Sequence, residues 1–136
     1  MAGYSGTPLP QKLDIKPGAR LGLFGAPADF DATLGRLPEN VTATTALRGA
    51  LDVAIFFTKS QTELKKRFDA LAKAIAPAGS LWISWPKKSS GVATDLDENV
   101  VRAIGLERGL VDVKVCAVDE IWSGLKFVVR VKNRPK

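Results

Sequence analysis

Histidine is absent from this 136-residue sequence, and cysteine occurs only once, at Cys116. Without histidine the chain cannot form a Ser-His-Asp triad, the common catalytic zinc sites or the usual general base near neutral pH. A single thiol cannot form an internal disulfide or build a zinc centre without partners. We therefore expect no metal site, and any acid–base chemistry would depend on carboxylates, lysines or Tyr4.

Long apolar runs are also missing. The longest, from Val53 to Phe57, is far shorter than the ~20 residues of a membrane helix. The N-terminus has no signal-peptide pattern, so we expect a cytoplasmic protein without membrane contact. The composition, with 46% hydrophobic and 25% charged residues, is typical of a globular domain. The net charge of +6 permits an anionic partner.

Strand-sized apolar segments alternate with polar stretches through the first two thirds of the chain. Strands are predicted at 19–25, 51–58 and 80–85. The segment 51–58 is almost continuously apolar, which indicates a strand covered on both faces, as in parallel sheets. The segment from Val41 to Thr45 is short and β-branched, which predicts an edge strand.

Three helices are predicted between these strands from apolar residues at helical spacing. The first includes Phe30. The second is expected to begin at Ser60, three residues before Glu63, which is the spacing of a capping box. The same spacing separates Asp95 from Glu98, where we expect the third helix to begin.

The C-terminal part has a different pattern. Apolar residues occupy alternate positions in 111–117 and in 125–132, which predicts an antiparallel hairpin with one solvated, basic face. The register favours a three-residue loop at 122–124, which would place Val115 opposite Val131.

The sequence therefore predicts one α/β domain over residues 1–136. It consists of an N-terminal arm (1–18), an alternating β/α core (19–110) and a C-terminal β-hairpin (111–132). The expected fold class is a three-layer, Rossmann-like, mostly parallel sheet of about six strands that ends in an antiparallel C-terminal hairpin.

Ligands of open α/β sheets bind outside the carboxyl ends of the strands. In this sequence those ends, together with the expected hairpin turn, supply two tryptophans, two adjacent lysines, hydroxyl groups and two carboxylates. The candidate ligand-binding residues are Gly25, Ala26, Pro27, Thr58, Trp85, Lys87, Lys88, Ser89, Asp119 and Trp122.

These candidates also have structural interpretations. The 25–27 loop has one glycine of the G-x-G-x-x-G pattern, and Pro27 lacks an amide hydrogen, so the loop could be a plain strand-to-helix turn. The 87–91 loop could hold an anion beside Trp85, or be a solvated loop. Asp119 and Glu120 are expected to point to opposite faces of a strand, which disfavours an acid–base pair.

A row of cations marks the C-terminal hairpin as a candidate contact for nucleic acid or another anion. The row consists of Lys126, Arg130, Lys132 and Arg134. Alternatively, these charges protect an edge strand from pairing. Cys116 is expected to be a passive, partly buried thiol; the alternative is that Lys114, on the same strand face, lowers the pKa of the thiol.

Three segments carry a resemblance to a known family: MAGYSGTPLPQKLDIKPG at the start, WPKKSSGVATDL, and GLVDVKVCAVDEIWSGLKFVVR. Together they resemble a small bacterial family known as domain of unknown function 3052, nearly from end to end. The resemblance implies a small cytosolic bacterial protein with no assigned activity.

The order of elements is similar to that of class I S-adenosylmethionine-dependent methyltransferases. In that family the glycine-rich loop after the first strand binds the cofactor, and an acidic residue after the second strand holds the ribose. The resemblance places the first of these at 25–27. The second strand, 41–45, ends in Thr-Thr-Ala without an acidic residue.

Three functions follow. We expect a non-catalytic or degenerate methyltransferase-like domain that binds a protein partner or a small anionic ligand at the strand ends, without a cofactor. The first alternative is a minimal methyltransferase that binds S-adenosylmethionine through an atypical loop. The second is a nucleic-acid-binding accessory protein that uses the basic hairpin face.

Overall fold

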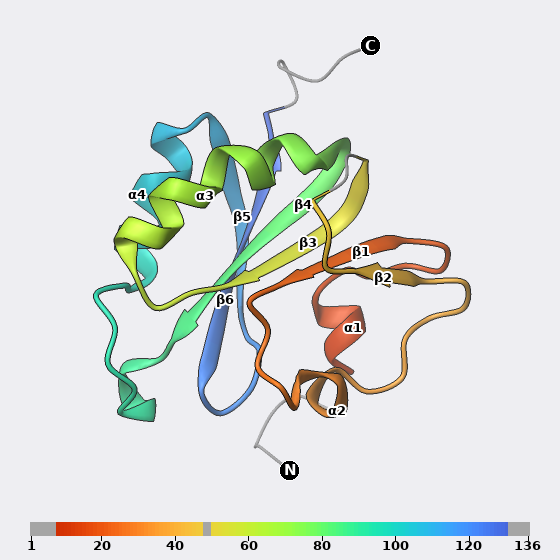
Figure 1. Cartoon of the computed structure of the whole chain (residues 1–136), viewed down its shortest axis with the longest axis horizontal. Coiled ribbons are helices and arrows are strands. Elements are labelled where there is room, and N and C mark those ends of the chain that lie inside the picture. The colour runs from red at the N-terminus through yellow and green to blue at the C-terminus, as the bar shows by residue number, and fades with distance from the viewer. Residues whose placement is uncertain (1–7, 48–49, 131–136) are drawn as a thin grey trace.

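A computed structural model describes residues 8–47 and 50–130 of the chain. Within these residues six strands form one sheet in the order β2-β1-β3-β4-β6-β5 (Figure 1). The strands are β1 (Arg20–Phe24), β2 (Thr42–Thr44), β3 (Leu51–Phe57), β4 (Ile75–Pro86), β5 (Leu110–Ala117) and β6 (Trp122–Val129). Strands β1 to β4 are parallel, and β6 is antiparallel to both β4 and β5. The predicted fold class is therefore confirmed.

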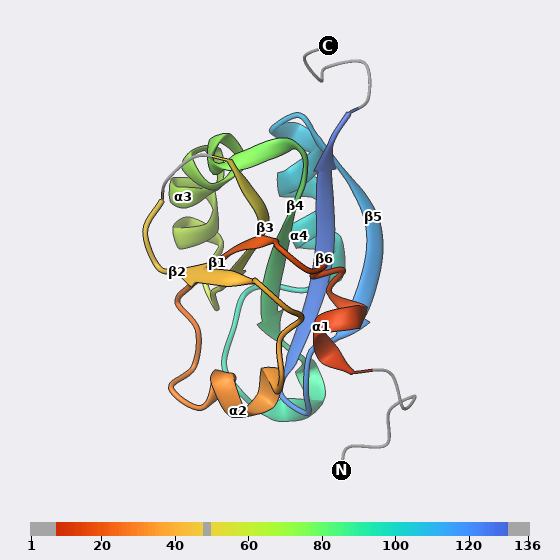
Figure 2. The same cartoon turned by 90° about the vertical axis from the view of Figure 1, so that its right-hand side faces the viewer.

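Helices cover both faces of the sheet and make three layers (Figures 1 and 2). Helices α3 (Gln61–Ala74) and α4 (Glu98–Glu107) lie on one face. The short helices α1 (Leu9–Lys12) and α2 (Phe30–Leu34) lie on the other. A 3-10 turn, η1 (Lys88–Ser90), follows β4. None of the helices in the described part of the chain has the length and apolar character needed to span a bilayer.

Each face of the sheet has its own apolar core. Leu64, Phe68 and Leu71 of α3 are fully buried against one face, at 0% exposure. On the other face the N-terminal arm is part of the core. Leu13 is also 0% exposed, and its carbonyl accepts a hydrogen bond from Trp82 Nε1 at 3.1 Å. The arm is thereby fixed to the middle of the sheet.

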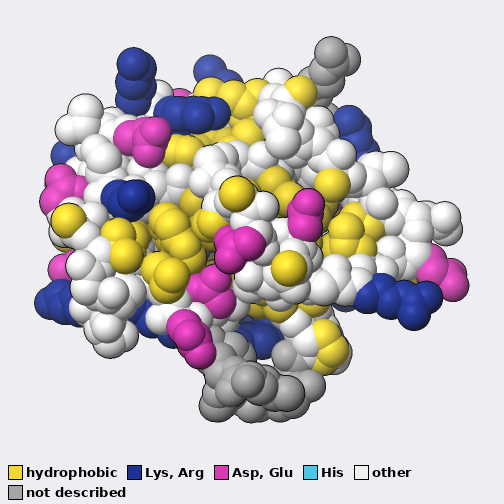
Figure 3. Space-filling model, turned by 60° about the horizontal axis from the view of Figure 1, so that its bottom comes forward, with side chains coloured by type: hydrophobic (Ala, Val, Ile, Leu, Met, Phe, Trp, Pro, Cys, Tyr) yellow, Lys and Arg dark blue, Asp and Glu magenta, His cyan; other side chains and the backbone are white. Residues whose placement is uncertain are grey.

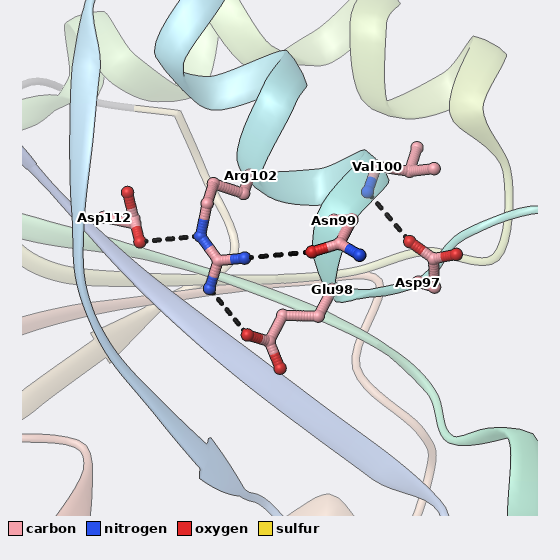
Figure 4. A network of polar contacts seen from close by, with 6 residues as sticks. All are labelled: Asp97, Glu98, Asn99, Val100, Arg102 and Asp112. Atoms are coloured by element: carbon pink, nitrogen blue, oxygen red, sulfur yellow. Dashed lines mark hydrogen bonds and ion pairs between the residues drawn. The ribbon is translucent and has the colours of Figure 1, made fainter.

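The start of α3 is as predicted, and the start of α4 is not. Ser60 Oγ accepts a hydrogen bond from Glu63 N at 3.2 Å. At α4 the cap is Asp97, whose Oδ1 accepts from Val100 N at 2.8 Å (Figure 4). Asp95 instead accepts from Gln61 N at 2.8 Å and so binds the first turn of α3. This tertiary contact explains why the capping-box spacing misplaced the helix start.

Helix α4 is tied to the neighbouring strand by one arginine. Arg102 Nε donates to Asp112 of β5 at 2.8 Å, and its other nitrogens contact Glu98 at 2.6 Å and Asn99 at 3.3 Å (Figure 4). The hydrogen bonds and ion pairs of Arg102 lower the pKa of Asp112 below its usual value. These polar contacts fix α4 over β5.

The predicted hairpin exists, but its turn and register were wrong. Residues 122–124 are the first residues of β6, and the chain turns at 118–121. Val115 pairs with Leu125 rather than with Val131, which lies outside the described residues. The turn is fixed by Asp119, whose Oδ1 accepts from the backbone nitrogens of Ile121 and Trp122, each at 2.8 Å. Such a side-chain-to-backbone turn competes with glycine-based loops.

The expected apolar face of β5 is also different. The ladder with β6 is irregular between Asp112 and Lys114, and a bulge of this kind changes which side chains face the core. Val113 and Val115 are consequently 53% and 47% exposed. The alternation in the sequence identified the strand, whereas the bulge decided which of its valines are buried.

Candidate functional site

The carboxyl ends of the parallel strands meet at one edge of the sheet, at the bottom of Figure 1. Phe24 at the end of β1 pairs with Phe56 of β3, and β3 continues beside β4. Because β6 is antiparallel to β4, its first residue, Trp122, lies opposite Pro86. The loops expected to converge at this edge therefore do so.

Gly25 is required at the end of β1 for two reasons. Its φ is +69°, in the left-handed region that side chains rarely occupy. A Cβ at this position would also lie 2.7 Å from the carbonyl oxygen of Phe57. The loop then closes through a hydrogen bond from Phe30 N to Pro27 O at 3.0 Å. The backbone of Gly25 therefore packs directly against the Phe57 carbonyl at the end of β3.

Two hollows meet at Gly25. The inner hollow, between β1 and β3, has a volume of about 480 Å³. It is lined by Gly25, Pro27, Phe57, Thr58, Lys59, Ser60, Glu63 and Trp122. The outer hollow, toward β2, has a volume of about 390 Å³. It is lined by Leu23, Phe24, Gly25, Ala26, Asp31, Thr45 and Arg67.

Aromatic rings form one wall of the inner hollow. The ring of Trp122 stands nearly perpendicular to that of Phe57, with centroids 5.2 Å apart. Phe57 in turn contacts Phe30 edge-on at 4.8 Å. Edge-to-face contacts of this kind hold rings in fixed positions. The wall is therefore preformed and apolar.

Thr58 shapes the inner hollow but has no free hydroxyl. Its Oγ1 donates to the carboxylate of Glu63 and accepts from Ser60 N at 3.3 Å. The side chain is 3% exposed. Thr58 and Glu63 together hold the first turn of α3 against the end of β3, so neither is placed as an unengaged acid or base.

Several predicted site residues line neither hollow. Trp85 is 5% exposed and belongs to the core under α3 and α4, because alternation along β4 directs it to that face. Lys87, Lys88 and Ser89 are in the loop that contains η1, which closes on itself through a hydrogen bond from Ser90 Oγ to Lys87 O at 2.6 Å. A ring-stacking role for Trp85 is therefore incompatible with its burial.

The remaining acidic candidate has a structural role. The carboxylate of Asp119 closes the β5–β6 turn and is held by two backbone nitrogens, as described above. Within the described residues no group of three or more acidic or cysteine side chains is placed to hold a metal ion. Asp119 therefore positions Trp122 rather than offering a free carboxylate.

The predicted basic stripe does not form a solvated face at Lys126. The N-terminal arm covers this residue, and its Nζ lies 2.8 Å from Asp14, which is also 3.4 Å from Lys114. Burial alone would raise the pKa of Asp14, but contacts with both lysines outweigh burial and lower it below 3.8. Arg130 is the last described residue, and Lys132 and Arg134 lie outside the described part of the chain.

Cys116 has the environment of the passive, partly buried thiol that the sequence favoured. It lies on the face covered by α1, where burial raises the pKa of its thiol above the usual 9.0. Lys12 and Lys114 lower the pKa by less than burial raises it. The partly buried thiol is therefore not activated.

Two charged residues of the outer hollow were not predicted from the sequence. Arg67 belongs to α3 and its guanidinium carbon lies 5.1 Å from the centre of the Phe56 ring. Asp31 belongs to α2 and is exposed. The spacing of four residues between Glu63 and Arg67 places both on the same face of α3, and this was the signal that could have identified Arg67.

The surface around the hollows is mixed in charge. Figure 3 brings this edge forward and shows hydrophobic side chains exposed across it, with several carboxylates among them. Most lysine and arginine side chains in this view lie toward its margins. The overall positive charge of the protein is therefore not concentrated at the strand ends.

Solved structures with a similar fold are S-adenosylmethionine-dependent methyltransferases. A methyltransferase from Aquifex aeolicus is 15% identical with a TM-score of 0.67, and the match covers 88% of this chain and 87% of that one. A putative type 11 methyltransferase from Sulfolobus solfataricus is 11% identical with a TM-score of 0.64, covering 94% and 93%. Magnesium protoporphyrin IX methyltransferase from Synechocystis, with bound SAH, is 15% identical with a TM-score of 0.53, covering 84% and 75%.

Sequence comparison identifies no family for this chain. No protein-family model matches the chain, so membership in domain of unknown function family 3052 is unconfirmed. A search of curated proteins also returned no match. The structural similarities show the fold: the chain has the Rossmann-like, six-stranded architecture found in S-adenosylmethionine-dependent methyltransferases.

Proposed function

We propose that this chain is a small methyltransferase-like protein that binds S-adenosylmethionine, or its product S-adenosylhomocysteine (SAH), in the two hollows at the carboxyl edge of the sheet. The observation that supports this most directly is Gly25. Gly25 lines both hollows, and because it carries no side chain its backbone packs closely against the Phe57 carbonyl and forms the floor between them. In open α/β sheets this is the place where ligands bind.

The lining of the hollows suits a ligand of mixed character. Phe57, Trp122 and Pro27 give the inner hollow an apolar wall, which would favour flat or thioether groups over water. Glu63 and Asp31 contribute one carboxylate to each hollow. Negative charge at the rim would attract the positively charged sulfonium group of S-adenosylmethionine.

Methyl transfer requires the protein mainly to position the methyl donor and the acceptor. Bound S-adenosylmethionine would supply an activated methyl group for transfer to an acceptor atom, with S-adenosylhomocysteine as the leaving group. Holding two reactants in alignment lowers the barrier without a catalytic acid or base. This agrees with a site that lacks histidine and whose Thr58 and Glu63 are hydrogen-bonded to each other.

The direct test is an NMR titration of the labelled protein with SAH. We expect amide shifts at Gly25, Phe57 and Lys59, and none at Gly91, which lies outside both hollows. Gly25→Ala, which must displace Phe57 O, should weaken the shifts in protein that remains folded, whereas the matched variant Gly91→Ala should keep them. The absence of any shift in the wild-type protein at millimolar SAH would exclude the proposal.

A further inference from the structure

Arg67 has unused hydrogen-bonding capacity at the outer hollow. Its side chain is half-buried and lines the outer hollow. None of the described ion pairs or hydrogen bonds includes its guanidinium. The residues outside the described range contain no aspartate or glutamate. Five N–H donors thus stand beside a hollow without a carboxylate partner.

The guanidinium is nevertheless held in place. It lies over the ring of Phe56, 5.1 Å from the ring centre, in a cation–π contact. Phe56 is 1% exposed and therefore rigid. A cation–π contact does not use the N–H groups of the guanidinium as hydrogen-bond donors, so they are available to a ligand. An arginine fixed in this way loses little freedom when it binds.

We propose that Arg67 forms an oxyanion subsite of the ligand site, so that a carboxylate or phosphate of the bound molecule lies against its guanidinium in the outer hollow. Planar guanidinium groups recognise both anions through paired hydrogen bonds. The inference rests on the proposed function for the position of the remainder of the ligand, in the inner hollow. It extends that function because it assigns a charged group to the ligand and a residue that binds it.

Asp31 makes the subsite selective. It lines the same hollow as Arg67, and no ion pair among the described residues joins the two. Its carboxylate repels an anion and so limits binding of small free anions. A ligand held by other contacts as well, such as the aromatic wall of the inner hollow, overcomes this repulsion. Asp31→Asn should therefore strengthen anion binding, whereas Arg67→Gln should weaken it.

The first experiment uses sodium phosphate as probe and the Arg67 Nε–H signal of the full chain as readout. We expect phosphate to shift the signal, with a lower dissociation constant in Asp31→Asn than in the wild type. Lys66→Gln is the matched control, because it removes the same charge from an exposed neighbour on α3. Two results would overturn the proposal. One is an Arg67 signal that phosphate does not shift in either the wild type or Asp31→Asn. The other is that Arg67→Gln and Lys66→Gln weaken phosphate binding, followed at the backbone amides of the outer hollow, to the same extent.

The second experiment identifies the source of the anion. SAH and 5′-methylthioadenosine share the adenosine thioether, but only SAH carries a carboxylate. If the anion belongs to the cofactor, Arg67→Gln should weaken SAH binding by about 10-fold or more, as expected for a charged hydrogen bond, and leave 5′-methylthioadenosine unchanged. If it belongs to a separate acceptor, Arg67→Gln should bind both compounds as the wild type does, while the phosphate-induced shifts of the Gly25 and Ala26 amides, which line the outer hollow, are lost.

The two proposals fail in different ways. Binding of phosphate at Arg67 without binding of SAH would contradict the methyltransferase-like function and leave the oxyanion subsite in place. Binding of SAH with no effect of Arg67→Gln, together with no phosphate response, would overturn the subsite and leave the function. Arg67→Lys keeps the charge but not the planar donors, and it should recover less than half of the lost binding energy.

Discussion

Replacement of Gly25 by alanine tests the geometry on which the site depends. Two effects should add. Placing a side chain at a φ of +69° costs about 1–2 kcal/mol. The new Cβ would lie 2.7 Å from Phe57 O, whereas ordinary contact begins at 3.4 Å. Relieving such overpacking costs about 1–3 kcal/mol. We therefore expect Gly25→Ala to lower the free energy of unfolding by about 2–5 kcal/mol.

Gly91→Ala is the matched control, because Gly91 has a φ of +76° and nothing within 4 Å of the position of a Cβ. It should lose only the conformational part, about 1–2 kcal/mol. Urea unfolding followed by tryptophan fluorescence measures both variants, with the midpoints compared at constant slope. Equal losses for the two variants, within about 0.5 kcal/mol, would refute the close approach of β1 to β3 at Gly25.

Three further predictions concern polar groups outside the hollows. Asp119→Ala should destabilise the protein by about 2 kcal/mol, since two backbone nitrogens lose their acceptor; Asp119→Asn should recover part of this, and an unchanged urea midpoint for alanine would contradict the assigned turn. The folded pKa of Asp14 lies below its usual 3.8, so its stabilising effect should be complete above about pH 5 and lost as the pH falls through the folded pKa. The stability difference between wild type and Asp14→Asn should accordingly shrink on acidification, and a difference independent of pH would argue against the ion pairs. Alkylation of Cys116 by iodoacetamide should show a midpoint above pH 9.0, because burial raises its pKa; rapid reaction at pH 7 would count against this environment.

The fold could be predicted from the sequence where one local signal decides the structure. The apolar run of β3 indicated a strand buried on both faces, and Ser60 marked the start of α3. The hairpin register could not be predicted, because it depends on Asp119 and on a bulge next to Asp112. The Asp119 turn is local but competes with other loop patterns of similar sequence, and the bulge is decided by the pairing of β5 with β6.

The location of the site could be predicted from the sequence, but several of the residues that line it could not. The strand ends located Gly25 and Trp122 at one edge, since parallel strands share the direction of their carboxyl ends. Trp85 was misplaced because the sequence does not show which face of a doubly covered strand a residue occupies. Arg67 was missed because its role depends on stacking against Phe56, a contact between a helix and a strand that no motif encodes.

The position of β6 has a consequence for the order of events during synthesis. β6 lies between β4 and β5, although it follows both in the chain. Until residue 129 has left the ribosome, β4 therefore presents an unpaired edge, and β5 has no neighbouring strand with which to pair. Nascent chains that end near Ala117 should then be substrates for chaperones or prone to edge-to-edge association. Pairing of both β4 and β5 thus waits for β6, the strand that follows them in the chain.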